Sequence, residues 1–197
     1  MSAPSGAGKT SLVRAAIEHL PALEVSISHT TRAQRAGERD GADYHFVDEN
    51  SFNRMVENRE FLEHATVFDH QYGTAAAAIR GQLGAGVDVI LEIDWQGAQA
   101  VRETMENVHS IFIVPPSVDE LERRLRGRGA DTDTVIARRM QQAANEISHM
   151  NEYDYLIVND DFDTALIELS AVITAARVRR VRQQNQHQAM LDSLIAP

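Results

Sequence analysis

The sequence contains no cysteine, only one lysine, and no apolar stretch long enough to span a membrane. Without cysteine there are no disulfides and no thiolate metal sites, which fits the reducing cytoplasm, where we expect the protein to reside. No signal peptide is visible at the N-terminus. The net charge of -10 argues against general binding to nucleic acids or anionic membranes. Local arginine clusters are therefore candidate sites for a phosphorylated small molecule.

The single lysine, Lys9, lies in the segment SGAGKT at residues 5–10, which matches the phosphate-cradling half of a P-loop. Every other basic residue is an arginine, whose planar fork is rigid, whereas lysine carries a compact ammonium. The backbone N–H groups of a P-loop curl around a phosphate and leave room for one compact cation. An arginine-rich composition that left one lysine by chance is the alternative, but it does not account for the glycines around Lys9.

The match to the P-loop pattern is incomplete. The first glycine of G-x-x-x-x-G-K-[ST] falls on Ala3, and the buried strand that should precede the loop is absent because the chain begins at Met1. We expect Met1 to occupy a position that belongs to this strand. The helix that should follow the loop is present at 10–20, with one apolar face, and it ends before Pro21.

The rest of the chain alternates strand-like apolar runs with helical patterns, which predicts an α/β protein with a parallel sheet covered by helices on both faces. The predicted core strands are 23–28, 87–94, 110–114 and 155–159. The predicted helices are 75–83, 96–105, 117–125, 134–150 and a long final helix at 164–188. Ser117 begins a capping box with Glu120.

Two segments interrupt this alternation. Residues 31–74 are polar, with short strands expected at 44–47 and 61–68 and a helix at 49–58, and we interpret them as an inserted subdomain. The arginine- and glycine-rich stretch within 125–138 is interpreted as a mobile lid. The core would then comprise 1–30 and 75–197, a size suited to one compact domain.

The segment from Ser28 to Glu38 follows a strand end, where ligands bind in open α/β sheets. Its two arginines, Arg32 and Arg35, are three residues apart and could clamp a phosphate through charge-assisted hydrogen bonds. A solvated loop in which these arginines pair with Glu38 and Asp40 is about equally consistent with this segment alone.

Taken in order, the motifs of the chain resemble those of the guanylate kinases, and closely those of the bacterial enzymes. They are SAPSGAGKTS, SHTTRAQRAGE, Gly41-x-x-Tyr44-x-Phe46-Val47, Glu60-Phe61-Leu62-Glu63, Tyr72-Gly73-Thr74, Ile93-Asp94-Trp95-Gln96-Gly97, Val114-Pro115-Pro116-Ser117, Arg126-Gly127-Arg128-Gly129 and Val158-Asn159-Asp160-Asp161. The resemblance runs from Ser2 to the C-terminal helix. It implies a P-loop NTPase-type fold in which 31–74 binds GMP.

The resemblance also implies roles for individual residues on the acceptor side. Those that hold the GMP phosphate would be Arg32, Arg35, Tyr44 and Tyr72, and those that read guanine would be Ser28, Glu63 and Thr74. Guanine offers N1–H and N2–H₂ as donors and O6 as an acceptor, so a carboxylate and a hydroxyl match that edge. Adenine lacks both donors and would leave a buried Glu63 unpaired, which could discriminate by roughly 10⁴.

Asp94 ends an apolar run at the carboxyl edge of the sheet, where an ionised group is costly without a role. We expect it near GMP and hydrated Mg²⁺, and count it among the catalytic and GMP-binding residues. Two residues earlier the family usually has Asp, and this chain has Glu92, whose reach is longer. Trp95 and Gln96 are interpreted as packing and hinge residues.

On the donor side, the loop residues and one later residue are expected to bind ATP: Ser5, Gly6, Ala7, Gly8, Lys9, Thr10, Ser11 and Asn159. The Thr10 hydroxyl would ligate Mg²⁺. Three arginines resemble lid residues that close on the ATP phosphates: Arg124, Arg128 and Arg139. Together with Lys9, Arg35 and Asp94 they form the predicted catalytic set. The cations in this set would lie close to the negative charge that develops on the transferred phosphoryl group, which is the main catalytic means in phosphoryl transfer.

The predicted activity is Mg²⁺-dependent transfer of the γ-phosphoryl group of ATP to GMP, and to dGMP, by in-line attack without a covalent intermediate. Two alternatives are a guanylate-kinase-like binding module without catalysis and a poorly folded product that lacks the strand before the loop. The expected partners are small molecules, without nucleic acid or membrane, and the oligomeric state stays open. The arginines at 177, 179, 180 and 182 are interpreted as a solvated face or a subunit contact.

Overall fold

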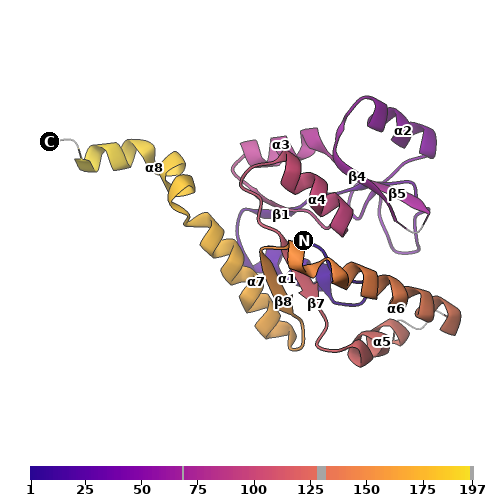
Figure 1. Ribbon diagram of the computed structural model, residues 1–197. Helices are drawn as coiled ribbons and strands as arrows, with labels where there is room; N and C mark the ends of the chain where they lie inside the picture. Colours follow the sequence, from indigo (N-terminus) through magenta and orange to yellow (C-terminus); the bar gives the residue numbers. More distant parts are fainter. Residues whose placement is uncertain (68, 128–131, 196–197) are drawn as a thin grey trace.

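The computed structural model describes residues 1–67, 69–127 and 132–195, and its core is a parallel α/β arrangement (Figure 1). Strands β1 (Leu23–Val25) and β6 (Asp88–Ile90) pair in parallel, as do β7 (Ile111–Val114) and β8 (Tyr155–Val158). The predicted α/β class with parallel strands is confirmed. The run predicted as a strand at 87–94 is shorter than expected, and residues 91–94 lead into the next helix.

The helices of the core lie close to their predicted positions. They are α1 (Lys9–His19), α3 (Ala76–Gly84), α4 (Trp95–Thr104), α5 (Val118–Arg126) and α6 (Asp133–Ser148). A 3₁₀ turn (Met150–Glu152), the last core helix α7 (Phe162–Arg177) and the terminal helix α8 (Arg180–Ile195) follow. Helices α1 and α7 pack against each other and share one apolar cluster with all four core strands. A second cluster joins α4 to β4 of the inserted segment through Ala98, Val101 and Leu62. Helices therefore hold the loop and the inserted segment against the sheet.

The N-terminal residues lie in the gap between the two strand pairs. The Met1 ammonium donates to the Leu91 carbonyl at 2.7 Å, and the Ser2 N–H donates to the Ile111 carbonyl at 3.0 Å. Ser2 also forms a parallel bridge with Phe112. As predicted, Met1 occupies a strand position, so the order of the core is β1, β6, residues 1–2, β7, β8. Burial lowers the pKa of the Met1 ammonium to about 5.

The same gap between the two strand pairs contains a cavity next to Met1. A largely apolar cavity of about 460 Å³ is lined by Met1, Val89, Leu91, Val108 and Ile111, among others. Successive residues of a strand point their backbone groups to alternate sides, so one edge of β6 and the backbone that leads into β7 turn polar groups toward this cavity. Two facing strand edges next to apolar side chains form a slot for one more parallel strand.

An engineered extension of Met1 by four or five β-branched residues is expected to raise the free energy of unfolding by about 2–4 kcal/mol. The added segment would pair with both edges and fill apolar space, and each such hydrogen bond contributes roughly 1 kcal/mol. Urea unfolding of the extended and original chains measures the change. A Gly-Ser extension of equal length is the control. Equal midpoints for the two extensions would show that the slot does not accept a strand.

The inserted segment forms its own small sheet of mixed direction, in the order β3-β2-β5-β4. Its elements are β2 (His29–Thr30), β3 (His45–Phe46), β4 (Phe61–Val67), β5 (His70–Ala75) and helix α2 (Glu49–Glu57). Phe52 of α2 is fully buried, and its ring lies 4.6 Å from that of Phe61 on β4. This packing anchors α2 on the β4–β5 hairpin, whose strands carry several of the predicted acceptor-side residues.

The long final helix predicted at 164–188 is wrong, because the chain breaks at Val178 into α7 and α8. Arg177 and Arg182 both bind Asp88, at 2.7 and 2.5 Å. In a straight helix two side chains five residues apart point about 140° away from each other. The bend brings both guanidinium groups onto one carboxylate. The interpretation of these two arginines as a solvated face is therefore wrong too.

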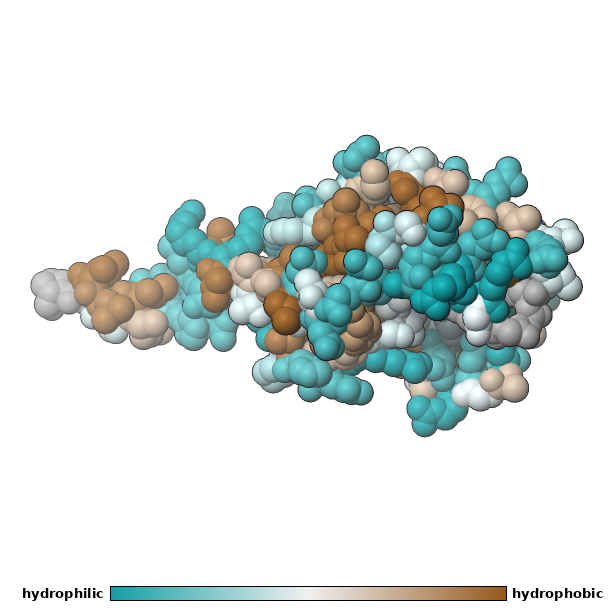
Figure 2. Space-filling view, turned by 90° about the horizontal axis from the view of Figure 1, so that it is seen from below, coloured by the Kyte–Doolittle hydropathy of each residue, from teal (hydrophilic) through white to brown (hydrophobic). Residues whose placement is uncertain are grey.

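Beyond the bend, α8 leaves the body of the protein (Figure 1). Most of its apolar side chains are exposed, and Figure 2 shows them along the projecting arm, interspersed with polar ones. Leu194 and Ile195 are 71% and 82% exposed. Within the described ranges, no helix combines the length and apolarity needed to cross a membrane.

Candidate functional site

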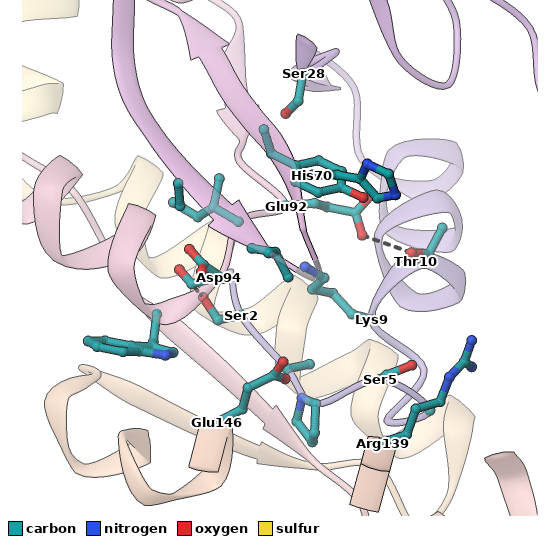
Figure 3. A pocket seen from close by; sticks show the side chains of 18 of the residues that line it. Ser2, Ser5, Lys9, Thr10, Ser28, His70, Glu92, Asp94, Arg139 and Glu146 are labelled. Carbon is teal, nitrogen blue, oxygen red and sulfur yellow. Dashed lines mark hydrogen bonds between the residues drawn. The ribbon is translucent and has the colours of Figure 1, made fainter. Parts of the chain in front are cut away.

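A cleft of about 590 Å³ lies between the core, the inserted segment and α6. The predicted site residues that line it are Ser5, Gly6, Gly8, Lys9, Thr10, Ser11, Ser28, Arg32, Arg35, Tyr44, Glu63, Tyr72, Asp94 and Arg139 (Figure 3). Ala7, Thr74, Arg124 and Asn159 lie outside this lining, and Arg128 lies outside the described residues. The structure thus brings together in one space residues far apart in the sequence.

The loop before α1 is shaped by two glycines. Gly6 and Gly8 have φ angles of 98° and 95°, in the left-handed region that glycine adopts without strain. A Cβ on Gly8 would also lie 2.3 Å from Nδ2 of Asn159. The same amide donates to the Ala7 carbonyl at 2.6 Å, so Asn159 stabilises the backbone of the loop. Asn159, which was predicted to bind ATP, lies outside the cleft lining, and its contact with ATP stays a prediction.

Lys9 begins α1, and its ammonium faces the cleft among acidic side chains. Burial lowers its pKa, while Glu92, Glu146 and Asp94 each act in the opposite direction. Among the residues that the structure describes, no carboxylate lies close enough to Lys9 for a direct ion pair. A desolvated cation that lacks an adjacent counter-ion is suited to receive an anionic ligand.

Oxygen donors surround the start of α1 and α4. The Thr10 hydroxyl donates to Glu92 Oε1 at 3.0 Å, so the longer Glu92 side chain reaches the loop (Figure 3). Asp94 accepts from the Gly97 N–H at 2.9 Å as the N-cap of α4. Capping offsets part of the cost of an ionised group at the sheet edge. In the described ranges, no group of three or more acidic or histidine side chains could hold a metal ion.

The predicted phosphate clamp is organised by one carboxylate. Arg32 donates to Glu38 Oε1 at 2.7 Å, and the Arg35 N–H donates to Glu38 Oε2 at 2.8 Å. The Arg32 guanidinium lies 5.3 Å from the Tyr44 ring centroid, and the Tyr44 and Tyr72 rings are 6.0 Å apart. Arg32 pairs with Glu38 as the alternative expected, but it is buried rather than part of a solvated loop, and the phosphate clamp stays a prediction.

The predicted guanine-reading carboxylate is buried. Glu63 is 6% exposed and accepts from the Thr74 hydroxyl at 2.5 Å. Burial raises the pKa of Glu63 to about 7, helped by Asp94 and opposed by Thr74. A Cβ on Gly97 would lie 2.5 Å from Glu63 Oε2, so only glycine at that position of α4 admits the carboxylate. Thr74 orients Glu63, and both Glu63 and Ser28 line the cleft.

The three predicted lid arginines differ in their surroundings. Arg124 on α5 donates to Glu120 at 2.6 Å and to the Asn159 carbonyl at 3.0 Å, away from the cleft lining. Ser117 caps α5 as predicted, but the Glu120 side chain of the proposed capping box is drawn to Arg123 and Arg124. Arg139 on α6 lines the cleft. Arg138, its neighbour on α6, lines the cleft as well, and the donor-side role of Arg139 stays a prediction.

Several residues that line the cleft were not predicted as site residues, among them Arg138, Glu146 and His70. Glu146 lies on α6 seven residues after Arg139, and His70 lies at the start of β5. A seven-residue spacing puts two side chains on one face of a helix, so Glu146 could have been found from Arg139. No such signal pointed to His70. Its place at the cleft follows from the path of the β4–β5 hairpin.

Comparison with known proteins assigns this architecture to a family. The family model described as guanylate kinase matches residues 1–176. The chain is 54% identical over 198 residues to a guanylate kinase of Photorhabdus laumondii, covering all of this chain and 96% of that protein. It is 55% identical over 196 residues to a guanylate kinase of Chromohalobacter salexigens, covering all of this chain and 91% of that protein.

A solved structure agrees with these sequence matches. The crystal structure of guanylate kinase from Anaplasma phagocytophilum aligns with a TM-score of 0.75 at 38% identity. The alignment covers 92% of this chain and 86% of that one. Sequence and fold therefore point to the same family.

Proposed function

The chain belongs to the guanylate kinase family of ATP:GMP phosphotransferases, and from that premise we propose which residues of the cleft perform the reaction. The γ-phosphoryl group of ATP passes to GMP, giving ADP and GDP, and we propose dGMP as a second acceptor. The observation that carries the assignment is that Lys9 and Glu63 line one cleft. A phosphate-binding loop and a guanine-reading carboxylate then face each other across the space where the phosphoryl group moves.

On the donor side, the backbone N–H groups of the loop would hold the ATP phosphates around Lys9. Gly6 and Gly8 leave this backbone accessible to a ligand, and Ser5 and Ser11 flank it. The Thr10 hydroxyl and the Glu92 carboxylate, 3.0 Å apart, are hard oxygen donors of the type that Mg²⁺ prefers. When bound with ATP, Mg²⁺ neutralises phosphate charge, and Thr10 would be its protein ligand.

On the acceptor side, the phosphate of GMP would be held by Arg35 together with Arg32, Tyr44 and Tyr72. The Arg32–Glu38 pair keeps this cluster in place before the substrate arrives. Glu63, held by Thr74, would accept hydrogen bonds from N1–H and N2–H₂ of guanine, and Ser28 would donate to O6. Asp94 lies between the two halves, where it would orient the acceptor.

We propose that residues 31–74 act as the GMP-binding subdomain and residues 125–138 as a lid. Arg139, just beyond the lid, would supply positive charge where the transferring group develops negative charge. The contacts of Arg124 and Arg128 with the ATP phosphates stay predictions for the closed state. Excluding water from the closed cleft would favour transfer to GMP over hydrolysis. The cytoplasm is the proposed location, in keeping with a sequence that has no cysteine.

A coupled assay of ADP release tests the proposed function directly. GMP and dGMP are expected to be phosphorylated, whereas AMP and UMP are expected to react at least roughly 10³-fold less efficiently in kcat/KM, because neither base offers the adjacent N1–H and N2–H₂ donors that would pair with the Glu63 carboxylate. A preference for AMP would contradict the roles given to Ser28 and Glu63. Binding of GMP without turnover would instead support a binding module that has lost catalysis.

A further inference from the structure

One face of α6 carries a series of polar side chains along the cleft. Arg139 and Glu146 are seven residues apart on this face, and both line the cleft. Just after the helix, the His149 ring stacks on Trp95 with centroids 3.7 Å apart and planes at 6°. This stack fixes the end of α6 against the start of α4, so the position of Glu146 is set by packing.

Glu146 extends from α6 into the donor half of the cleft. Figure 3 shows its carboxyl group between Asp94 on one side and the loop with Ser5 and Lys9 on the other. An acidic side chain here is unexpected, because the ATP phosphates that this region would receive are strongly anionic. The role proposed for the loop does not explain this carboxylate.

Glu146 and Lys9 influence each other electrostatically. Burial raises the pKa of Glu146 to about 7, Lys9 opposes this rise, and Asp94 adds to it. In return Glu146 is one of the three carboxylates that oppose the lowering of the Lys9 pKa by burial. In the empty cleft, an ionised Glu146 therefore partly compensates the desolvated ammonium.

We propose that Glu146 is a positioning residue that serves as a replaceable counter-ion for Lys9 and takes up one proton when a nucleoside triphosphate binds. In the empty site its carboxylate offsets the charge of Lys9. When the phosphates arrive they take over that role, and two anions facing one cation become unfavourable. One proton from solvent then binds a carboxylate oxygen of Glu146, and no other bond changes.

The replacement of Glu146 by the ATP phosphates as counter-ion of Lys9 determines how the affinity for ATP changes with pH. Bound phosphates raise the pKa of Glu146 further, so the bound state holds more protons than the free state above about pH 7. Affinity for ATP is therefore expected to fall as the pH rises above 7, through this residue. Below that pH, Glu146 is already neutral and contributes no dependence.

Several other ionisable groups must be separated from Glu146. Those that line the same cleft are Lys9 on α1, Glu63 on β4, Glu92 and Asp94 before α4, and Arg138 and Arg139 on α6. The Met1 ammonium, which interacts electrostatically with Lys9, and His149 after α6 lie outside that lining. Lys9 is the main competitor, because its lowered pKa would also rise when anions bind. Replacing Glu146 alone distinguishes the two.

The experiment is calorimetric titration of ATP with Mg²⁺ into the protein without GMP, at about pH 8, in buffers of different ionisation enthalpy. The protein is expected to take up about half a proton or more per ATP bound. The Glu146→Gln variant should take up none, and should bind ATP about fivefold to tenfold more tightly at this pH. Near pH 6 the two proteins should bind equally.

The matched control is Glu168→Gln, which removes the same charge from an exposed position of α7. It should keep both the proton uptake and the affinity of the original chain. ATP binding without proton uptake in the original protein overturns the proposal, whether or not the variant folds. If Glu146→Gln takes up as many protons as the original protein, the proposal is wrong and Lys9 is the group that binds the proton.

The inference rests on the proposed donor site, and the same titration tells the two failures apart. If ATP does not bind at all, the donor-site assignment fails and the role of Glu146 falls with it. If ATP binds with a pH dependence that Glu146→Gln does not change, only the role of Glu146 is refuted. A purely structural role would shift the thermal unfolding temperature without altering proton uptake.

Discussion

Replacing Lys9 with arginine is expected to lower kcat for GMP phosphorylation by at least about 100-fold while the fold stays intact. The ammonium is desolvated at the start of α1, and the loop around it is held by Asn159 behind Ala7. A guanidinium keeps the charge but is broader, planar and rigid. It would displace the phosphates or the loop, so the charge would no longer lie where the transferring oxygens need it.

Steady-state kinetics of Lys9→Arg, with circular dichroism and thermal unfolding, measure this effect. Arg14→Lys is the matched control, since Arg14 lies on the same helix and its side chain is 71% exposed. It should leave kcat nearly unchanged. Near-original activity in Lys9→Arg would refute the argument that the loop requires a compact cation. A large fall in the unfolding temperature would assign the loss to the fold instead.

Replacing Glu63 with glutamine is expected to lower kcat/KM for GMP by about 10²–10³ and to affect AMP far less. The buried carboxylate accepts from the Thr74 hydroxyl through one oxygen, and we propose that its other oxygen accepts from guanine. An amide would turn an N–H₂ donor toward the N1–H and N2–H₂ donors of the base. Two unpaired donors in a buried site cost far more than the loss of one exposed hydrogen bond.

The pH profile of the same variant gives a second readout. Because burial raises the pKa of Glu63 to about 7, the original protein should lose GMP affinity as the pH falls through 7 and the carboxylate is protonated. KM for GMP should therefore rise toward pH 6 in the original chain and stay level in Glu63→Gln. Glu60→Gln, an exposed neighbour, is the control and should retain the original profile. An unchanged GMP preference in Glu63→Gln would overturn its role.

Much of the fold could be predicted from the sequence. Apolar runs and capping residues are local signals, and they mark a helix or strand clearly where they occur together. The loop around Lys9, the cap at Ser117 and the strand at 111–114 lie where the sequence places them. The break at Val178 could not be predicted, since no glycine or proline marks it. It depends on Asp88, which meets Arg177 and Arg182 only after β6 and α7 have packed together.

The candidate site, too, could be predicted from the sequence only in part. Most of the site residues predicted from the order of the motifs line the cleft, but the motifs could not tell which side of the loop Asn159 occupies. In the structure Asn159 supports Ala7, and Arg124 contacts the Asn159 carbonyl rather than the cleft. Both placements depend on how α5 and β8 approach the loop, which is a long-range property of the packed core.

By itself the sequence determined the family, the reaction class and the chemistry of the loop, because the spacing of glycines, one lysine and a hydroxyl encodes a local backbone shape. Only the tertiary structure decided the electrostatic setting of those residues. Burial raises the pKa of both Glu63 and Glu146 to about 7, and these residues lie on different elements, far apart in the sequence. A pKa is set by every charge and apolar group within several ångströms, and that neighbourhood exists only after the chain has folded.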